Sequence, residues 1–420
     1  MARKIQTISI IYLLAWLLCP PLSYGLLFRL LALASCGIWF LCQYLFAKRI
    51  RLTAQNTLEK YGQYYFIAAA AYILGEFFLQ VLFLEADVVS IVYNNLQVYI
   101  LLIIGFIGTQ YVAEERWDEI KTTMIAIVLF CVVFSVTSIF RGAEYELVTR
   151  EAGGESKFDE AFLMAAARRG IGGFGFFCFT SILAPALLYL VKGGVKDKRV
   201  QGLLILSMII CEIGVISAGY TLALLISILG FFLVFFLTAK SSITKFFLIC
   251  GTILLIALGS QILNTIYEML LALFDGTMYE NKVRDIFAFL IEGESEGTFA
   301  SRAERYLTSL QSMWDYPIFG SVFLSGKRAI GSHSSVLDSF AAYGWLVGFC
   351  WLYLIALYHN QVMKYCGMKS SLRIALILLI FLTGLFNRLV MMIGGLYFVM
   401  PFIAHYGKEE KDNESSLGVI

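Results

Sequence analysis

The chain has 420 residues, of which 60% are hydrophobic and only 15% are charged. Its 32 lysines and arginines nearly balance 30 aspartates and glutamates, for a formal net charge of +2. Apolar runs recur from end to end, which excludes a water-soluble core and gives no sign of a nucleic-acid-binding surface. We therefore predict an all-α polytopic membrane protein, with residues 1–420 forming a single integral membrane domain.

Apolar runs close to 20 residues long, the length that crosses a bilayer as a helix, occur about twelve times. Between them we expect two long outer loops, about 142–170 and 265–336, and we expect the second loop to be partly helical. Residues 406–420 form the predicted cytoplasmic tail, and its polar part from Lys408 onward is predicted to be disordered. The predicted spans lie at about 8–26, 28–47, 64–84, 91–112, 122–141, 171–191, 201–217, 220–238, 246–264, 337–358, 373–387 and 389–405.

The distribution of lysine and arginine predicts the orientation. Short segments on the side of the N-terminus are basic, for example Lys48, Arg49 and Arg51 after the second run. The positive-inside rule therefore predicts that both termini are cytoplasmic, and it does not apply to the two long outer loops. No cleavable signal peptide is expected, because the first run continues through Pro20 and Pro21 without a small-residue cleavage pattern. The predicted location is the cytoplasmic membrane, crossed many times.

Cysteine and histidine usage gives no metal signature. The nine cysteines form no CxxC pair, and the three histidines are His333, His359 and His405. His333 lies in the second outer loop, whereas the other two lie at the cytoplasmic ends of predicted spans. We expect no metal site and no cofactor.

The stretch 301–344 holds the most polar chemistry beside a new apolar run. Ser301 and Glu304 form a capping-box pattern that predicts a helix from Arg302, and Pro317 predicts that it ends near Trp314. Such a helix is amphipathic, and it suits either the lipid headgroup layer or a ligand. Its apolar face would hold Ala303, Leu307, Leu310 and Trp314, and its polar face Arg302, Arg305, Ser309 and Ser312.

Arginines stand in both outer loops. Arg168 and Arg169 end the first loop, and Arg302 and Arg305 lie in the second. Arginine forks bind phosphate oxygens and keep their charge, so arginines on one membrane face suit a lipid-linked pyrophosphate. His333 can accept a proton from an attacking hydroxyl or orient it. Together these residues predict group transfer from a lipid pyrophosphate.

Several of these residues have a second interpretation. His333 can instead be an interfacial residue before a helix that Ser334 and Ser335 cap. Asp338 either orients His333 or is a first-turn acid favoured by the helix dipole. Trp314 and Tyr316 are either interfacial anchors or stacking partners for a sugar ring.

Glu76 and Glu212 lie inside predicted spans, where a charge is expensive and often functional. Each can equally be a neutral acid or a hydrogen-bonding group between helices. A cavity lined by both residues would favour a transporter.

Short motifs in this chain resemble those of the bacterial O-antigen polymerase and O-antigen ligase superfamily. Arg302 and Trp314, followed by Pro317-Ile318-Phe319-Gly320, are similar to that family's R…W…P-x-x-G pattern. The run from His333-Ser334 to Tyr343-Gly344 resembles the family's H-N block, which opens the span after the large outer loop.

Two further motifs are similar to those of the family. Arg169-x-x-Gly172 resembles the arginine motif that ends the earlier outer loop, and Ser217-Ala218-Gly219 resembles a Ser-Arg-Gly turn. Ser334 stands where the family has asparagine, and Ala218 where it has arginine, so contacts of those two side chains do not carry over. Which of Arg168 and Arg169 matches the family arginine stays open.

The resemblance implies a metal-independent, inverting glycosyltransferase with a GT-C-like fold, acting on the outer face of the cytoplasmic membrane without a cofactor. An acceptor hydroxyl would attack the anomeric carbon of a sugar chain on undecaprenyl pyrophosphate. Arg169 and Arg302 would bind the leaving group, with Arg305 and Arg168 as further candidates. His333 would position or deprotonate the acceptor, with Asp338 in support.

We therefore expect a polymerase that joins undecaprenyl-pyrophosphate-linked oligosaccharide repeat units into O-antigen, capsule or exopolysaccharide. A ligase that transfers the polymer to a lipid, protein or wall acceptor is the alternative within the family. A lipid-linked-saccharide transporter and a non-catalytic assembly partner are alternatives of other classes. Expected partners are the lipid-linked donor and acceptor, membrane lipid, and a chain-length regulator or flippase.

Overall fold

The computed structural model describes residues 2–23, 25–47, 57–83, 88–141, 160–193, 195–218, 220–239, 241–243, 246, 250, 267–273, 275–276, 280, 284, 298–321, 330–331, 333–386 and 390–416. Within these ranges the elements are helices, and no strand occurs among them. They are α1 (Ala2–Leu18), α2 (Pro20–Ser23), α3 (Leu26–Ala47), α4 (Thr57–Phe83), α5 (Val88–Ala113), α6 (Trp117–Arg141), α8 (Glu160–Arg168), α9 (Phe174–Gly193), α10 (Lys198–Ala218), α11 (Thr221–Thr238), α15 (Thr298–Asp315), α16 (Ser335–Leu357), the π-helix η4 (Tyr358–Val362), α17 (Met363–Tyr365), α18 (Ser370–Phe386) and α19 (Val390–Ser416).

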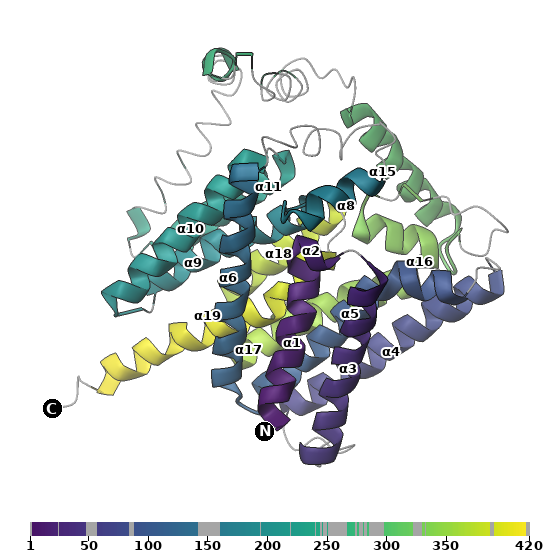
Figure 1. Cartoon of the computed structure of the whole chain (residues 1–420), viewed down its shortest axis with the longest axis horizontal. Helices are drawn as coiled ribbons and strands as arrows, with labels where there is room; N and C mark the ends of the chain where they lie inside the picture. The colour runs from purple at the N-terminus through teal and green to yellow at the C-terminus, as the bar shows by residue number, and fades with distance from the viewer. Residues whose placement is uncertain are drawn as a thin grey trace.

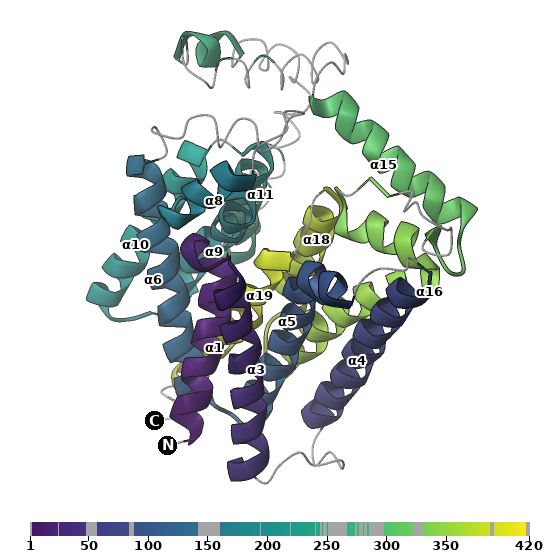
Figure 2. The same cartoon turned by 45° about the vertical axis from the view of Figure 1, so that its right-hand side comes forward.

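The long helices run alongside one another as a bundle (Figures 1 and 2). The start of α1 and the end of α19 lie together at one end of the bundle, which we call the termini end. The short helix α8 and the helix α15 lie at the opposite end, which we call the loop end. The described helices of the two predicted long loops, α8 and α15, therefore lie at the end of the bundle opposite the two termini.

The core of the bundle is apolar, and so is much of its outer surface. Helix α9 packs against α10, α11 and α19, and its side chains are mostly buried. On α10, by contrast, large apolar side chains such as Leu203, Leu206 and Ile213 are exposed. Helices whose backbone groups are satisfied internally, with apolar side chains outside, suit a lipid environment.

Six helices of the described chain are long and apolar enough to cross a membrane. Shorter apolar helices cover 222–238, 370–385 and 393–406. The predicted class, an all-helical multi-pass membrane protein, is confirmed at this level. The six are Leu26–Leu45, Asn95–Ala113, Trp117–Arg141, Phe174–Gly193, Lys198–Ala218 and Ser335–Tyr365.

The predicted apolar runs coincide with helices except for 246–264, which lies outside the described residues apart from 246 and 250. The count of about twelve spans stays a prediction. The first run, 8–26, is divided into α1 and α2, because Pro20 lacks the N–H that would continue the α1 ladder and instead begins a new helix. The tail expected to be disordered continues α19 through Ser416, consistent with the high helix propensity of its lysines and glutamates.

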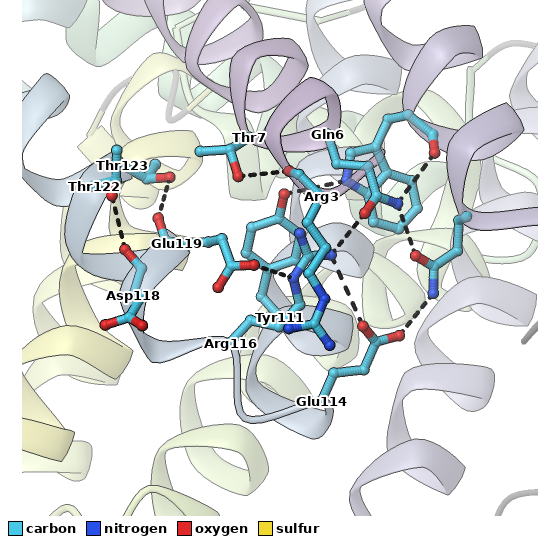
Figure 3. Close-up of polar contacts among 12 residues, drawn as sticks. Arg3, Gln6, Thr7, Tyr111, Glu114, Arg116, Asp118, Glu119, Thr122 and Thr123 are labelled. Atoms are coloured by element: carbon cyan, nitrogen blue, oxygen red, sulfur yellow. Dashed lines mark hydrogen bonds and ion pairs between the residues drawn. The ribbon is translucent and has the colours of Figure 1, made fainter. Parts of the chain in front are cut away.

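A buried arginine joins helices at the termini end (Figure 3). Arg116, in the turn between α5 and α6, is only 2% exposed. Its Nε donates to Glu119 Oε1 at 3.2 Å, and its Nη1 donates to Gln6 Oε1 at 3.0 Å. Its guanidinium also lies 4.0 Å from the centre of the Tyr111 ring. A buried charge is tolerated only with such partners, so these contacts explain how the arginine is accommodated.

The same cluster extends to α3. Gln6 donates to Gln43 Oε1 at 2.8 Å, and Gln43 donates to Glu114 Oε1 at 2.7 Å. These hydrogen bonds therefore connect α1, α3 and the α5–α6 turn. They satisfy the polar atoms of Gln6 and Gln43, which are buried away from water.

We expect Arg116→Ala to destabilise the protein by about 3–5 kcal/mol, because it leaves the Glu114 and Glu119 carboxylates without their buried cation. Unfolding in mild detergent, followed by circular dichroism, measures the change. Lys121→Ala is the matched control, since Lys121 is an exposed cation on α6, the helix that follows Arg116. Equal stability of the two variants would contradict a structural role for the cluster.

Candidate functional site

Helix α15 packs along the first part of α16 at the loop end, and the side that carries Ser309 and Ser312 is turned toward the protein. Ser309 and Ser312 are buried, whereas Leu307 and Trp314 on the opposite face are exposed. The helix begins at Thr298, so the predicted start at Arg302 is wrong. Residues 298–300 contain neither glycine nor proline, so a helix that is already nucleated extends through them at little cost.

A hydrogen-bonded carboxylate joins α15, α16 and the segment between them. Ser309 donates to Asp338 Oδ1 at 2.6 Å, and the Ser334 backbone N–H donates to Asp338 Oδ2 at 3.0 Å. The Gly331 N–H donates to Ser309 Oγ at 2.8 Å. Backbone groups on both sides of His333 are therefore fixed by the Ser309–Asp338 pair.

Ser334 begins α16 as its N-cap. Its hydroxyl accepts a hydrogen bond from the Leu337 N–H at 3.0 Å and donates to the Gly384 carbonyl of α18 at 3.1 Å. Asp338 lies in the first turn of α16, as one of its two predicted roles requires. It also holds the residue next to His333, so it acts on His333 through the backbone.

His333 lies beside Arg305. Nη1 of Arg305 is 3.4 Å from Nε2 and 3.5 Å from Nδ1 of the imidazole. A guanidinium can only donate hydrogen bonds, so the ring nitrogen that it contacts must carry a lone pair. The pair thus places a permanent positive charge next to a neutral imidazole, and that ring can accept a proton only when Arg305 no longer occupies its lone pair.

The turn after α15 is fitted against a kink in α16. Gly344 interrupts α16 with a φ of 78°, and the N–H of Trp345 donates to the Pro317 carbonyl at 2.7 Å. A Cβ at Gly320 would lie 2.3 Å from the Ala342 carbonyl carbon, and one at Gly344 would lie 2.3 Å from the Ile318 oxygen. Only glycine fits either position. The P-x-x-G turn, Pro317 to Gly320, therefore packs directly against the Tyr343-Gly344 pair.

The two intramembrane glutamates each form a hydrogen bond between helices. The Tyr343 hydroxyl of α16 donates to Glu76 of α4, and both groups are buried. Ser227 of α11 lies 2.8 Å and 2.7 Å from the two carboxylate oxygens of Glu212 on α10. These contacts fit the structural interpretation of both residues.

The structure describes a cavity between α9, α11, α18 and α19. Its lining is apolar and includes Pro185, Leu233, Leu376 and Met400, with neither Glu76 nor Glu212 among the lining residues. It therefore lacks the paired carboxylates that would favour a transporter.

Arg168 and Arg169 lie at the end of α8, and both side chains are exposed. The Arg169 carbonyl accepts a hydrogen bond from Arg141 Nη1 at 3.2 Å. In Figure 2, α8 and α15 lie on different sides of the loop end. The described residues therefore bring Arg305 and His333 together, but they do not bring Arg168 or Arg169 to them.

Ser309 and Ser312 belong to this site but were not among the predicted site residues. Their position on the same helix face as Arg305 is the sequence signal that could have identified them. The Arg302 side chain lies outside the described residues. Within the part of the chain that the structure describes, there is no group of three or more histidines, cysteines or carboxylates able to hold a metal ion.

Comparison with known proteins finds no family model that matches the chain and no curated protein that matches its sequence. The resemblance to the O-antigen superfamily therefore rests on the short motifs, and the geometry of the loop end has to carry any functional argument.

We expect Gly344→Ala to destabilise the protein by at least about 2 kcal/mol, since alanine disfavours a positive φ and its methyl group would overlap the Ile318 carbonyl. Unfolding in detergent and protease cleavage between α15 and α16 both measure the loss. Gly202→Ala on α10 is the matched control, because a Cβ there meets nothing within 4 Å. A Gly344 variant as stable and protease-resistant as the control would rule out the interlocked contact.

Proposed function

We propose that this chain is a membrane glycosyltransferase with a GT-C-like fold that polymerises undecaprenyl-pyrophosphate-linked oligosaccharide repeat units into surface polysaccharide. In this proposal the termini end faces the cytoplasm and the loop end faces outward, as the distribution of basic residues predicts. The observation that carries the proposal is the contact of Arg305 with His333, next to the part-buried hydrogen bond between Ser309 and Asp338.

The reaction would be an inverting displacement. An acceptor sugar hydroxyl attacks the anomeric carbon of the donor chain, a new C–O bond forms, and the bond from that carbon to the pyrophosphate oxygen breaks. Undecaprenyl pyrophosphate leaves with the electron pair, and the hydroxyl proton passes to His333 or to water that His333 orients.

Arg305 would stabilise the negative charge that develops on the leaving pyrophosphate. Arg302 is a second candidate because it lies one turn earlier on the same side of α15 by helical spacing. Ser312 is also buried on this face, and its hydroxyl makes no hydrogen bond among the described residues. Arg168 and Arg169 would serve a second phosphate group or the acceptor.

A ligase would use the same donor with a different acceptor, and the product distinguishes the two. A polymerase produces a ladder of chain lengths on lipid-linked material, whereas a ligase moves finished chains to another acceptor. No observation favours a transporter, since Glu76 and Glu212 bond across helices and the described cavity is apolar.

Arg305→Ala and His333→Ala should each reduce polymer formation about a hundred- to a thousandfold, because one removes the charge stabiliser and the other the proton acceptor. Arg305→Lys should recover only part of the activity, because lysine keeps the charge but loses the fork. The assay is gel analysis of polymer length in a strain lacking its own polymerase, at matched membrane expression.

Arg284→Ala is the matched control for Arg305. Arg284 lies in the same predicted outer loop, its side chain is 55% exposed, and it forms an ion pair with Glu280, four residues earlier, at 2.9 Å. An unchanged ladder in the Arg305 and His333 variants would exclude this site, whereas loss of the ladder in all three variants would point to a general defect of the loop.

Asp338 should behave as a positioning residue. Asp338→Ala should lower turnover about a hundredfold, because a displacement near 1 Å at His333 is enough for such a loss. Asp338→Asn should keep most of the activity, since its amide oxygen can still accept the Ser334 N–H. Turnover and the Michaelis constant are measured with purified lipid-linked repeat units. Equal losses in the two variants would contradict the positioning role.

A further inference from the structure

The faces of α15 are reversed relative to a helix on the surface of a soluble protein. Ser309 is 1% exposed and Ser312 is 3% exposed, so the hydroxyl-bearing face is directed at the protein. Leu307 is 63% exposed and Trp314 is 61% exposed, so the apolar face points away from it. In water an amphipathic helix packs the other way, with its apolar stripe on the core.

The apolar surface continues beyond α15. Ile318 and Phe319 in the following turn are exposed, and so are Leu346 and Phe349 on α16. These segments are adjacent, because the rings of Trp314 and Trp345 are 5.4 Å apart and the Trp345 N–H donates to Pro317. We call Leu307, Leu310, Trp314, Ile318, Phe319, Trp345, Leu346 and Phe349 the loop-end apolar patch.

A third side of α15 is polar and exposed. Glu304, Thr308, Gln311 and Asp315 follow one another at helical spacing between the buried and the apolar faces. A helix with one exposed flank apolar and another polar fits the boundary between hydrocarbon and water. The apolar flank continues onto α16, which is long and apolar enough to span a membrane. Contact with lipid explains this continuity better than contact with a second copy of the chain.

We propose that the loop-end apolar patch is inserted into the bilayer leaflet at that end of the bundle, with α15 lying along the membrane surface. The leaflet is then the partner that holds α15 over α16 from outside, while Ser309 and Asp338 hold it from within. Arg305 and His333 consequently open at the depth of lipid headgroups, where a lipid-borne phosphate lies. This proposal goes beyond the proposed function and does not need it, because its test uses no saccharide substrate.

Tryptophan quenching tests the insertion. The full chain is reconstituted in vesicles of phosphatidylethanolamine and phosphatidylglycerol, part of which carries bromine on the acyl chain close to the glycerol. The emission of Trp314 is the difference between the wild type and Trp314→Phe. The emission of Trp351 is obtained in the same way from Trp351→Phe and serves as the control, because Trp351 is on α16 but only 3% exposed.

We expect the Trp314 component to be quenched more strongly by brominated lipid than the Trp351 component, and only weakly by aqueous iodide. Strong iodide quenching without lipid quenching would show that the patch faces water and would overturn the proposal. Quenching by neither reagent, with chemical cross-linking to a dimer, would assign the patch to a second copy and would overturn it equally. Circular dichroism of each phenylalanine variant verifies that the helical fold is retained.

Discussion

Helix α15 reaches its place through a contact of backbone with backbone. The turn 317–320 lies on the α16 kink at Gly344 so closely that neither Gly320 nor Gly344 has room for a Cβ. This contact sets the distance between the two helices, and the hydrogen bond from Ser309 to Asp338 then sets their register. Arg305 and His333, which are remote in sequence, meet only because both constraints are satisfied.

Elsewhere in the bundle, too, specific contacts determine which helices pack together. In a membrane, apolar packing between helices competes with equally apolar lipid, so polar contacts and close backbone approaches give the assembly its specificity. Arg116 serves α1, α5 and α6 in this way, Tyr343 and Glu76 join α16 to α4, and Glu212 and Ser227 join α10 to α11. Glu76 and Glu212, whose carboxylates are costly to place in a membrane, thus form hydrogen bonds between helices.

Much of this fold could be predicted because long apolar runs have few alternatives to a helix. The end of α15 before Pro317 and the two faces of that helix were also predictable from spacing. Periodicity does not say which face of an amphipathic helix packs against the protein. In α15 the face with Ser309 and Ser312 does so. In our proposal the reason is that the apolar face of α15 contacts lipid and not water. Nor could periodicity reveal that Gly344 breaks α16, or that α8 and α15 lie apart. Those features depend on contacts between distant segments.

The reversed faces of α15 also bear on the order of assembly. A chain is synthesised from its N-terminus, so α15 is made before α16 exists. Until then the Asp338 carboxylate is not available to Ser309, and the polar side of α15 must remain hydrated. In our proposal the apolar side of α15 can already contact the membrane at this stage. Pairing with Asp338 becomes possible only after the α16 segment has been inserted, and the cluster around His333 is therefore completed late in biogenesis.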